Sequence, residues 1–250
     1  MVRSQLSTDP VYEPGDGGYT NYVGGGYAAG NVDLSPYAID SEVVHIAGAE
    51  TITGQKKFGT DTDNTTFEAD GTMKFNGAAT VEDDINISLV PPQGGAAAPA
   101  IIAFNGDARL DCYAFSGTNP TPDEIHSSLE ILHGYEEGSD ISFHLHWYPT
   151  DTNVGKVKWQ LRYTWFNRST VPGAAVTVAV VSTTSGVAWQ EQTTSFSISG
   201  VGKTMGSRFV FSIFRNATDI QDTYAHYAAV TDMGVHYEKD TVGSRTTLTK

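Results

Sequence analysis

Two segments in which apolar and polar residues alternate strictly constrain the fold of this chain most. Residues 141–148 and 157–165 each place apolar side chains on one face of an extended strand and mostly polar side chains on the other. The apolar positions are Ile141, Phe143, Leu145, Trp147, Val157, Trp159, Leu161, Tyr163 and Trp165. We predict two neighbouring strands joined by the turn at residues 149–155.

Further short segments with strand-forming residues surround this pair, and Gly, Pro and Asn separate them. They are residues 101–104, 111–115, 128–132, 176–182, 192–198, 209–214 and 228–237. The chain has no long amphipathic helix pattern. We therefore predict an all-β protein whose residues 101–250 form an antiparallel β-sandwich of jelly-roll type, the head domain.

The N-terminal segment, residues 1–45, is rich in Gly and Tyr and shows no helix or strand period. We predict an extended arm that docks on a partner, with Tyr12, Tyr19, Tyr22 and Tyr27 as anchors. The alternative is an arm held by its own oligomer. Residues 89–100 contain three prolines between Gly and Ala and are expected to form a linker.

Between the arm and the linker, residues 46–88 are Thr-, Gly- and Asp-rich, and their apolar residues are too widely spaced to form a core within one chain. A β-prone segment that cannot bury itself usually needs copies of itself. We predict an oligomerisation collar, expected to be trimeric, through Ile52, Phe58, Phe67, Met73, Phe75, Val81 and Ile85. The alternative is an extended linker with one loose hairpin.

Charge and composition exclude several classes of function. The 250 residues carry a formal net charge of -14, and the first 100 hold 4 Lys/Arg against 14 Asp/Glu. This argues against a binder of nucleic acid or anionic membranes, because both need basic patches. No apolar run is long enough for a membrane span, and the opening residues lack the apolar core of an export signal. The single cysteine, Cys112, excludes an internal disulfide.

Residues 49–58 (AETITGQKKF) and 67–85 (FEADGTMKFNGAATVEDDI) resemble segments of fibre and appendage proteins of tailed bacteriophages. The head carries a second resemblance to phage virion proteins, in residues 133–141 (HGYEEGSDI), 144–147 (HLHW), 159–165 and 240–245 (DTVGSR). The resemblance implies a homotrimeric virion protein, made in the host cytoplasm, that docks on other virion proteins by its arm and displays its head. It implies a structural protein and no enzyme or cofactor.

Two rival functions remain open. The first is a tail-tip receptor-binding protein that recognises host carbohydrate, for which Trp189, after Ser185 and Gly186, is the exposed aromatic candidate. The second is a polysaccharide depolymerase that uses Glu136 and Glu137. We favour the second less, because adjacent carboxylates point apart, whereas glycoside hydrolysis needs two carboxyl groups about 5 to 10 Å apart in a cleft.

His144 and His146 lie two residues apart on one strand face, so both imidazoles point the same way. This spacing is compatible with metal binding, but no Cys, Asp or Glu follows at ligand spacing. We therefore expect these histidines to form hydrogen bonds or a subunit contact, and we expect no metal site. The acidic turn at residues 61–64 lacks the glycine and the final acidic residue of a calcium loop and is expected to be solvated.

Overall fold

The computed structural model describes residues 54–90, 97–244 and 246–247. The predicted arm, its anchors Tyr12, Tyr19, Tyr22 and Tyr27, and Ile52 in the collar lie outside the described residues. So does the middle of the predicted linker. Among the described residues, no helix has the length and apolar character that crossing a bilayer requires.

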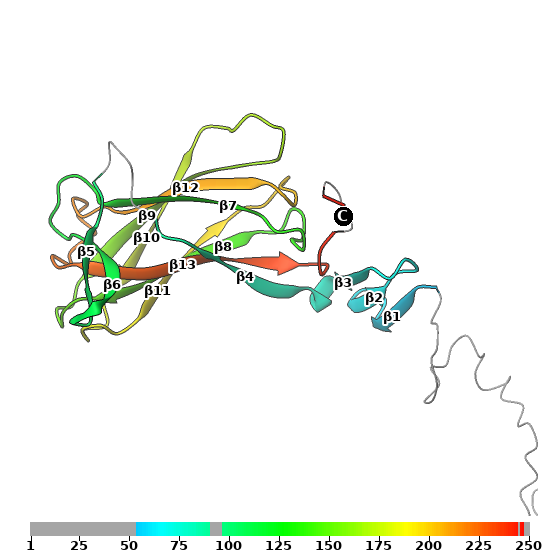
Figure 1. Ribbon diagram of the computed structural model, residues 1–250, viewed down its shortest axis with the longest axis horizontal. Helices are drawn as coiled ribbons and strands as arrows, with labels where there is room; N and C mark the ends of the chain where they lie inside the picture. The colour runs from blue at the N-terminus through cyan, green and yellow to red at the C-terminus, as the bar shows by residue number, and fades with distance from the viewer. Residues whose placement is uncertain (1–53, 91–96, 245, 248–250) are drawn as a thin grey trace, which may run out of the picture. The chain divides into compact units, whose positions relative to one another are not determined.

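The described chain is an antiparallel β-sandwich preceded by a small β-sheet, which confirms the all-β prediction (Figure 1). Eight strands form the two layers of the sandwich. They are β6 (Asp107–Phe115), β7 (Glu124–Glu130), β8 (Ile141–Pro149), β9 (Lys156–Phe166), β10 (Val176–Thr183), β11 (Gln192–Ile198), β12 (Arg208–Arg215) and β13 (Ala228–Lys239). One sheet has the order β10-β9-β12-β7, and the other has the order β11-β8-β13-β6-β5, with β5 (Ala100–Phe104) at its edge.

The strand pairing is nested. β6 pairs with β13, β7 with β12, β8 with β11 and β9 with β10. The first strand of the eight therefore lies beside the last, the second beside the seventh, and so on inward. This is the topology of a long antiparallel hairpin rolled into two sheets, which is the predicted jelly roll.

The core lies between the two sheets and is built from the alternating apolar residues of both layers. β8 and β9 are not neighbours in one sheet, which corrects the predicted strand pair. The turn after β8 carries the chain to the opposite layer, so the two apolar faces pack against each other. The rings of Trp147 and Trp159 meet there at 5.9 Å between centroids. The two strands therefore contribute to the core from opposite sheets.

Strand β4 (Val81–Ile87) changes the predicted domain boundary. The sequence placed these residues in the collar, but β4 pairs along its whole length with the second half of β13, from Val81 opposite Lys239 to Ile87 opposite Met233. Ile87 is buried and Ile85 packs against the sandwich core. The larger sheet therefore begins at residue 81, before the predicted linker, because the open edge of β13 accepts a further strand.

The remaining collar residues form a separate three-stranded sheet of β1 (Lys56–Gly59), β2 (Asn64–Phe67) and β3 (Met73–Asn76), followed by the 3₁₀ turn η2 (Gly77–Ala79). β3 continues the hydrogen bonding to the segment after β13. The backbone N–H of Phe75 donates to the carbonyl of Asp240 at 2.7 Å, and Lys74 is bridged to Thr241.

Candidate functional site

A stripe of aromatic, histidine and acidic side chains follows the outer face of the larger sheet. It runs along β8, whose side chains at 142, 144, 146 and 148 point away from the core, and along the facing positions of β13 and β4. We call this set the outer stripe. Its members are Phe104, Tyr148, Trp189, Glu191, His146, Asp232, His144, His236 and Asp84.

One end of the outer stripe is a cluster of three half-buried aromatic rings. The ring of Phe104, on β5, lies 5.0 Å from the ring of Tyr148 and 5.2 Å from the ring of Trp189, with edge-to-face geometry in both contacts. Trp189 comes from the loop between β10 and β11. Three elements distant in sequence thus converge to form this aromatic cluster.

Trp189 is held in a left-handed backbone conformation, with a φ of 62°. A bulky residue with positive φ is a backbone outlier, and such strain of about 1 to 3 kcal/mol concentrates at binding sites. Its backbone N–H donates to the carbonyl of Pro149 at 2.8 Å, which fixes the loop to the end of β8. The other tryptophans, Trp147, Trp159 and Trp165, are buried in the core. The sequence-based choice of Trp189 as the surface tryptophan is consistent with this placement.

Glu191 connects the aromatic cluster to the histidines. Its carboxylate accepts a hydrogen bond from the hydroxyl of Tyr148 at 3.1 Å, and the Nδ1 atom of His146 lies 3.0 Å from its other oxygen. The Nε2 atom of His146 lies 3.7 Å from Asp232. Both ring nitrogens of His146 therefore face carboxylates, and the exposed acids leave acceptors for a polar ligand beside the rings.

At the other end of the outer stripe, His144, His236 and Asp84 come together from β8, β13 and β4. His144 is buried, and burial lowers its pKa, although the nearby Asp84 opposes this effect. Two imidazoles and a carboxylate are a recognised set of transition-metal ligands. The sequence suggests His144 and His146 as the candidate metal ligands instead, because these two are close in sequence. His236 and Asp84 are distant in sequence and reach His144 only through strand pairing.

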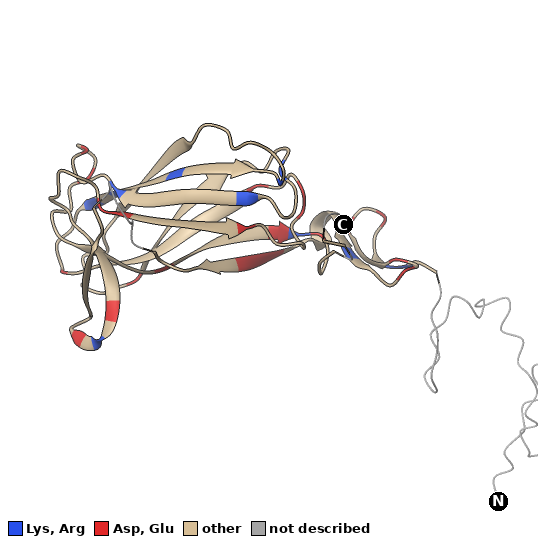
Figure 2. Cartoon of the chain, turned by 45° about the horizontal axis from the view of Figure 1, so that its top comes forward, with Lys and Arg blue, Asp and Glu red and all other residues tan. Residues whose placement is uncertain are grey.

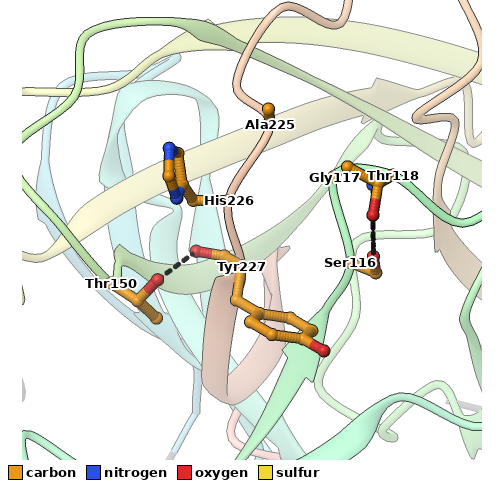
Figure 3. A pocket seen from close by; sticks show the side chains of 7 residues that line it. All are labelled: Ser116, Gly117, Thr118, Thr150, Ala225, His226 and Tyr227. Atoms are coloured by element: carbon orange, nitrogen blue, oxygen red, sulfur yellow. Dashed lines mark hydrogen bonds between the residues drawn. The ribbon is translucent and has the colours of Figure 1, made fainter.

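A cavity of about 170 Å³ lies at the end of the sandwich and is lined by polar groups (Figure 3). Its lining residues are Ser116, Gly117, Thr118, Thr150, Ala225, His226 and Tyr227. The Nδ1 atom of His226 lies 2.7 Å from Asp151, and its Nε2 atom lies 3.0 Å from the amide nitrogen of Asn153. Since the amide donates to Nε2, this nitrogen is not free to take a proton from a hydroxyl. The arrangement therefore positions the loop and does not form a nucleophilic triad.

The collar sheet has an apolar face that the described chain leaves uncovered. Strand register places Phe58, Thr65 and Phe75 in one row and Lys56, Phe67 and Met73 in the next row of the same face. The Phe58 and Phe67 rings contact each other at 6.0 Å, yet the residues are 62% and 40% exposed.

On the opposite face of the same sheet, polar residues of the central strand β2 are buried. Asn64 and Thr66 are 3% and 2% exposed, and the side-chain oxygen of Asn64 accepts hydrogen bonds from Thr66 at 2.8 Å and from Asn76 at 2.9 Å. The collar sheet thus leaves two phenylalanines exposed on one face while its central strand buries polar side chains on the other. Val81 of the predicted collar set is also exposed, in β4, whereas Ile85 already packs on the sandwich core.

Glu137, one of the two carboxylates weighed for a depolymerase, contacts the backbone of another loop. Glu137 accepts a hydrogen bond from the backbone N–H of Met205 at 3.1 Å, which ties the turn at residues 136–139 to the loop before β12. Charged residues of both signs are interspersed over the described part of the sandwich, with an acidic run at residues 82–84 on β4 (Figure 2).

The sequence and structure comparisons assign no family. No family model matches the chain, and no curated protein matches it. Among solved structures, dimeric latent PorU from Porphyromonas gingivalis is similar with a TM-score of 0.31 and 8% identity, over 64% of this chain and 13% of that chain. The CBM22-2 xylan-binding domain of Paenibacillus barcinonensis Xyn10C is similar with a TM-score of 0.27 and 13% identity, over 50% of this chain and 86% of that chain. At these TM-scores neither similarity carries an argument about function.

Proposed function

We propose that this chain is a non-enzymatic display protein that forms a homo-oligomer through its collar and presents the jelly-roll head, in the manner of a phage fibre or appendage. The uncovered aromatic face of the collar sheet is the observation that carries the proposal. The resemblance of residues 49–58 and 67–85 to phage fibre segments supports a trimer and a place in the virion.

The size of the apolar surface supports association. A phenylalanine side chain buries about 150 to 250 Å² when it is fully covered. The exposed fractions of Phe58 and Phe67 therefore leave about 200 Å² per chain, which would contribute about 5 kcal/mol on burial. A second copy of the collar is the natural cover, because most oligomers are symmetric and pair like surfaces.

The oligomeric state of the full chain tests this proposal. We expect light scattering coupled to gel filtration to give a trimer for the native chain and monomers for the double variant Phe58→Ser/Phe67→Ser. The matched control is Val201→Ser/Ile220→Ser, two residues that are 80% and 93% exposed on loops of the sandwich. A monomeric native chain, or a collar variant that stays trimeric, would refute the role of the collar.

The arm supplies the attachment in this proposal. Residues 1–36, with their interleaved tyrosines and glycines, would dock on other virion proteins. A chain that lacks residues 1–36 is expected to keep its oligomeric state and to be absent from assembled particles. Normal incorporation of the shortened chain would contradict the docking role.

The aromatic cluster favours a second, compatible function, which is the recognition of carbohydrate on a host surface by the head. Sugar rings bind proteins by placing their apolar faces on aromatic rings and their hydroxyls on charged or amide acceptors. The half-buried ring of Trp189, with Glu191 and Tyr148 beside it, offers both elements. Oligomerisation would raise the apparent affinity of such a weak site.

Trp189 also provides the assay. Because the other three tryptophans are buried, acrylamide quenching of fluorescence reports mainly on Trp189. Host polysaccharide that binds the cluster is expected to protect the native chain from quenching. In glycan-array binding, Trp189→Asn removes the ring and keeps a residue that tolerates positive φ, so we expect at least a tenfold loss. Tyr227→Ala, at an exposed tyrosine outside the outer stripe, is the control. Equal binding by both variants would exclude the aromatic cluster as the site.

A further inference from the structure

The end of the outer stripe that holds His144, His236 and Asp84 has the geometry of a metal site. His236 on β13 and Asp84 on β4 are directly opposite each other in strand register. His144 on β8 is opposite Gly234, two residues before His236 on the same face of β13. The pleat of three adjacent strands thus points the two imidazoles and the carboxylate toward one location.

The distances are close to those of a coordination shell. The Nε2 atoms of His144 and His236 each lie 3.8 Å from the same oxygen of Asp84, and one potential ligand atom from each residue lies within 4.8 Å of the others. Ligands at about 2.0 to 2.1 Å from a tetrahedral zinc ion are about 3.3 Å apart. Small side-chain rotations would close the remaining gap, and these rotations are available because His236 and Asp84 are half-exposed.

His144 is the buried member of the cluster. The residue is 4% exposed, and its buried Nδ1 atom has no hydrogen bond of ordinary geometry among the described residues. Its Nε2 atom faces the Asp84 carboxylate without a close hydrogen bond. A buried imidazole normally satisfies its nitrogens. The Nε2 atom, which faces Asp84, is the ring nitrogen that would bind a cation in this cluster.

Gly234 makes room for the cluster. A Cβ atom at this position would lie 2.8 Å from the Cε1 atom of His144 and 2.8 Å from an oxygen of Asp84. Only glycine therefore lets the imidazole and the carboxylate approach over β13. A hollow of about 140 Å³ lies beside His236 and is lined by residues that include Glu82, Ser142 and Ser197.

We propose that Asp84, His144 and His236 bind a divalent transition-metal ion, with Zn²⁺ as the best match. Two imidazole nitrogens favour zinc, copper or nickel over calcium and magnesium, which prefer oxygen ligands. Three protein ligands leave a further position open to water or to an oxygen of a bound molecule. His146 lies outside the ligand set because its nitrogens face Glu191 and Asp232.

The test uses the full chain without a histidine tag, stripped with a chelator and dialysed. Calorimetric titration with ZnCl₂ is expected to show one ion per chain, and Co²⁺ is expected to give the visible absorption of a tetrahedral complex. His236→Ala and Asp84→Asn, both at exposed positions, are expected to weaken Zn²⁺ binding more than tenfold, since even second-shell changes cost 10- to 100-fold.

His126→Ala is the matched control, because His126 is an exposed histidine that contacts Glu124 on β7 of the opposite sheet. It is expected to bind Zn²⁺ as the native chain does. Circular dichroism confirms that each variant is folded. The proposal is overturned if the native chain binds no stoichiometric Zn²⁺, if both site variants bind normally, or if the control loses binding equally.

Discussion

Replacing Asp222 with asparagine is expected to destabilise the sandwich strongly, because Asp222 is the counter-charge of the buried Arg215. The side chains of the two residues are 1% and 0% exposed, respectively. The guanidinium donates to both carboxylate oxygens, at 2.9 Å from Nε and 2.7 Å from Nη2. Its remaining N–H groups donate to the carbonyls of Phe115, Tyr224 and His226. All five donors are thus used, and the loop between β12 and β13 is tied to the end of β6.

The magnitude follows from the burial. Removing one partner of a buried ion pair costs about 3 to 5 kcal/mol, because the other charge stays buried without compensation. Asp222 also accepts a hydrogen bond from the backbone N–H of Lys158 at 2.9 Å, which asparagine can keep through its carbonyl oxygen. For a domain of this size, 1 kcal/mol corresponds to about 2 to 4 °C in melting temperature. We therefore expect Asp222→Asn to lower it by about 6 to 20 °C.

Calorimetry and urea unfolding measure this loss. Glu130→Gln is the control, since Glu130 pairs with Arg208 at 2.7 Å but both side chains are largely exposed, and such pairs contribute at most about 1 kcal/mol. The double variant Arg215→Met/Asp222→Leu, which buries no charge, is expected to be more stable than the sum of the single losses predicts. If Asp222→Asn costs no more than the control, the buried pair does not hold the loop.

Three further predictions concern pH and packing. Burial raises the pKa values of Tyr135 and Tyr237 to about 12, so the stability they contribute is present below pH 10 and is lost as the pH rises through 12. Urea unfolding across this range should show the decline, and Tyr135→Phe/Tyr237→Phe should make it shallower. Burial raises the pKa of Asp151, but hydrogen bonds and a nearby histidine outweigh this effect, so the pKa is lowered. Asp151→Asn should therefore be less stable than the native chain at pH 7, and the difference in stability should vanish as the pH falls below about 4. Gly234→Ala should lower the melting temperature and abolish Zn²⁺ binding in the same titration, because the added Cβ atom would lie 2.8 Å from Cε1 of His144. Unchanged Zn²⁺ binding would mean that the His144 ring is not needed at its present position.

The strands of the head could be predicted from sequence because the core supplies a local signal. Alternation at residues 141–148 and 157–165 marks which side chains are buried, and the structure buries nearly all of them. Alternation does not say which sheet a strand joins, so β8 and β9 were wrongly paired. The sequence did not indicate that β4 belongs to the head, because its acidic run interrupts the apolar alternation that would mark Ile87 as buried. Its partner strand, β13, also lies about 150 residues away.

The candidate sites depended still more on distant pairing. Trp189 could be selected because it follows a Ser-Gly turn and stands outside the strand patterns. Its neighbour Phe104 could not, since nothing in the sequence joins β5 to this loop. The same limit applies to Asp84 and His236, which meet His144 only after β4, β8 and β13 align. The sequence shows the residue types, whereas the strand register determines which of them become neighbours in space.

The pairing of β13 has a consequence for the timing of synthesis. This strand is hydrogen-bonded to β4, β6 and β8, and the two residues after it complete the edge of β3. A ribosome must therefore translate through residue 241 before the larger sheet or the collar edge can close. Such long-range pairing folds slowly. Chains that terminate before β13 would lack the strand that joins β4, β6 and β8, so the larger sheet could not close even though β7, β9, β10 and β12 of the other layer had been made.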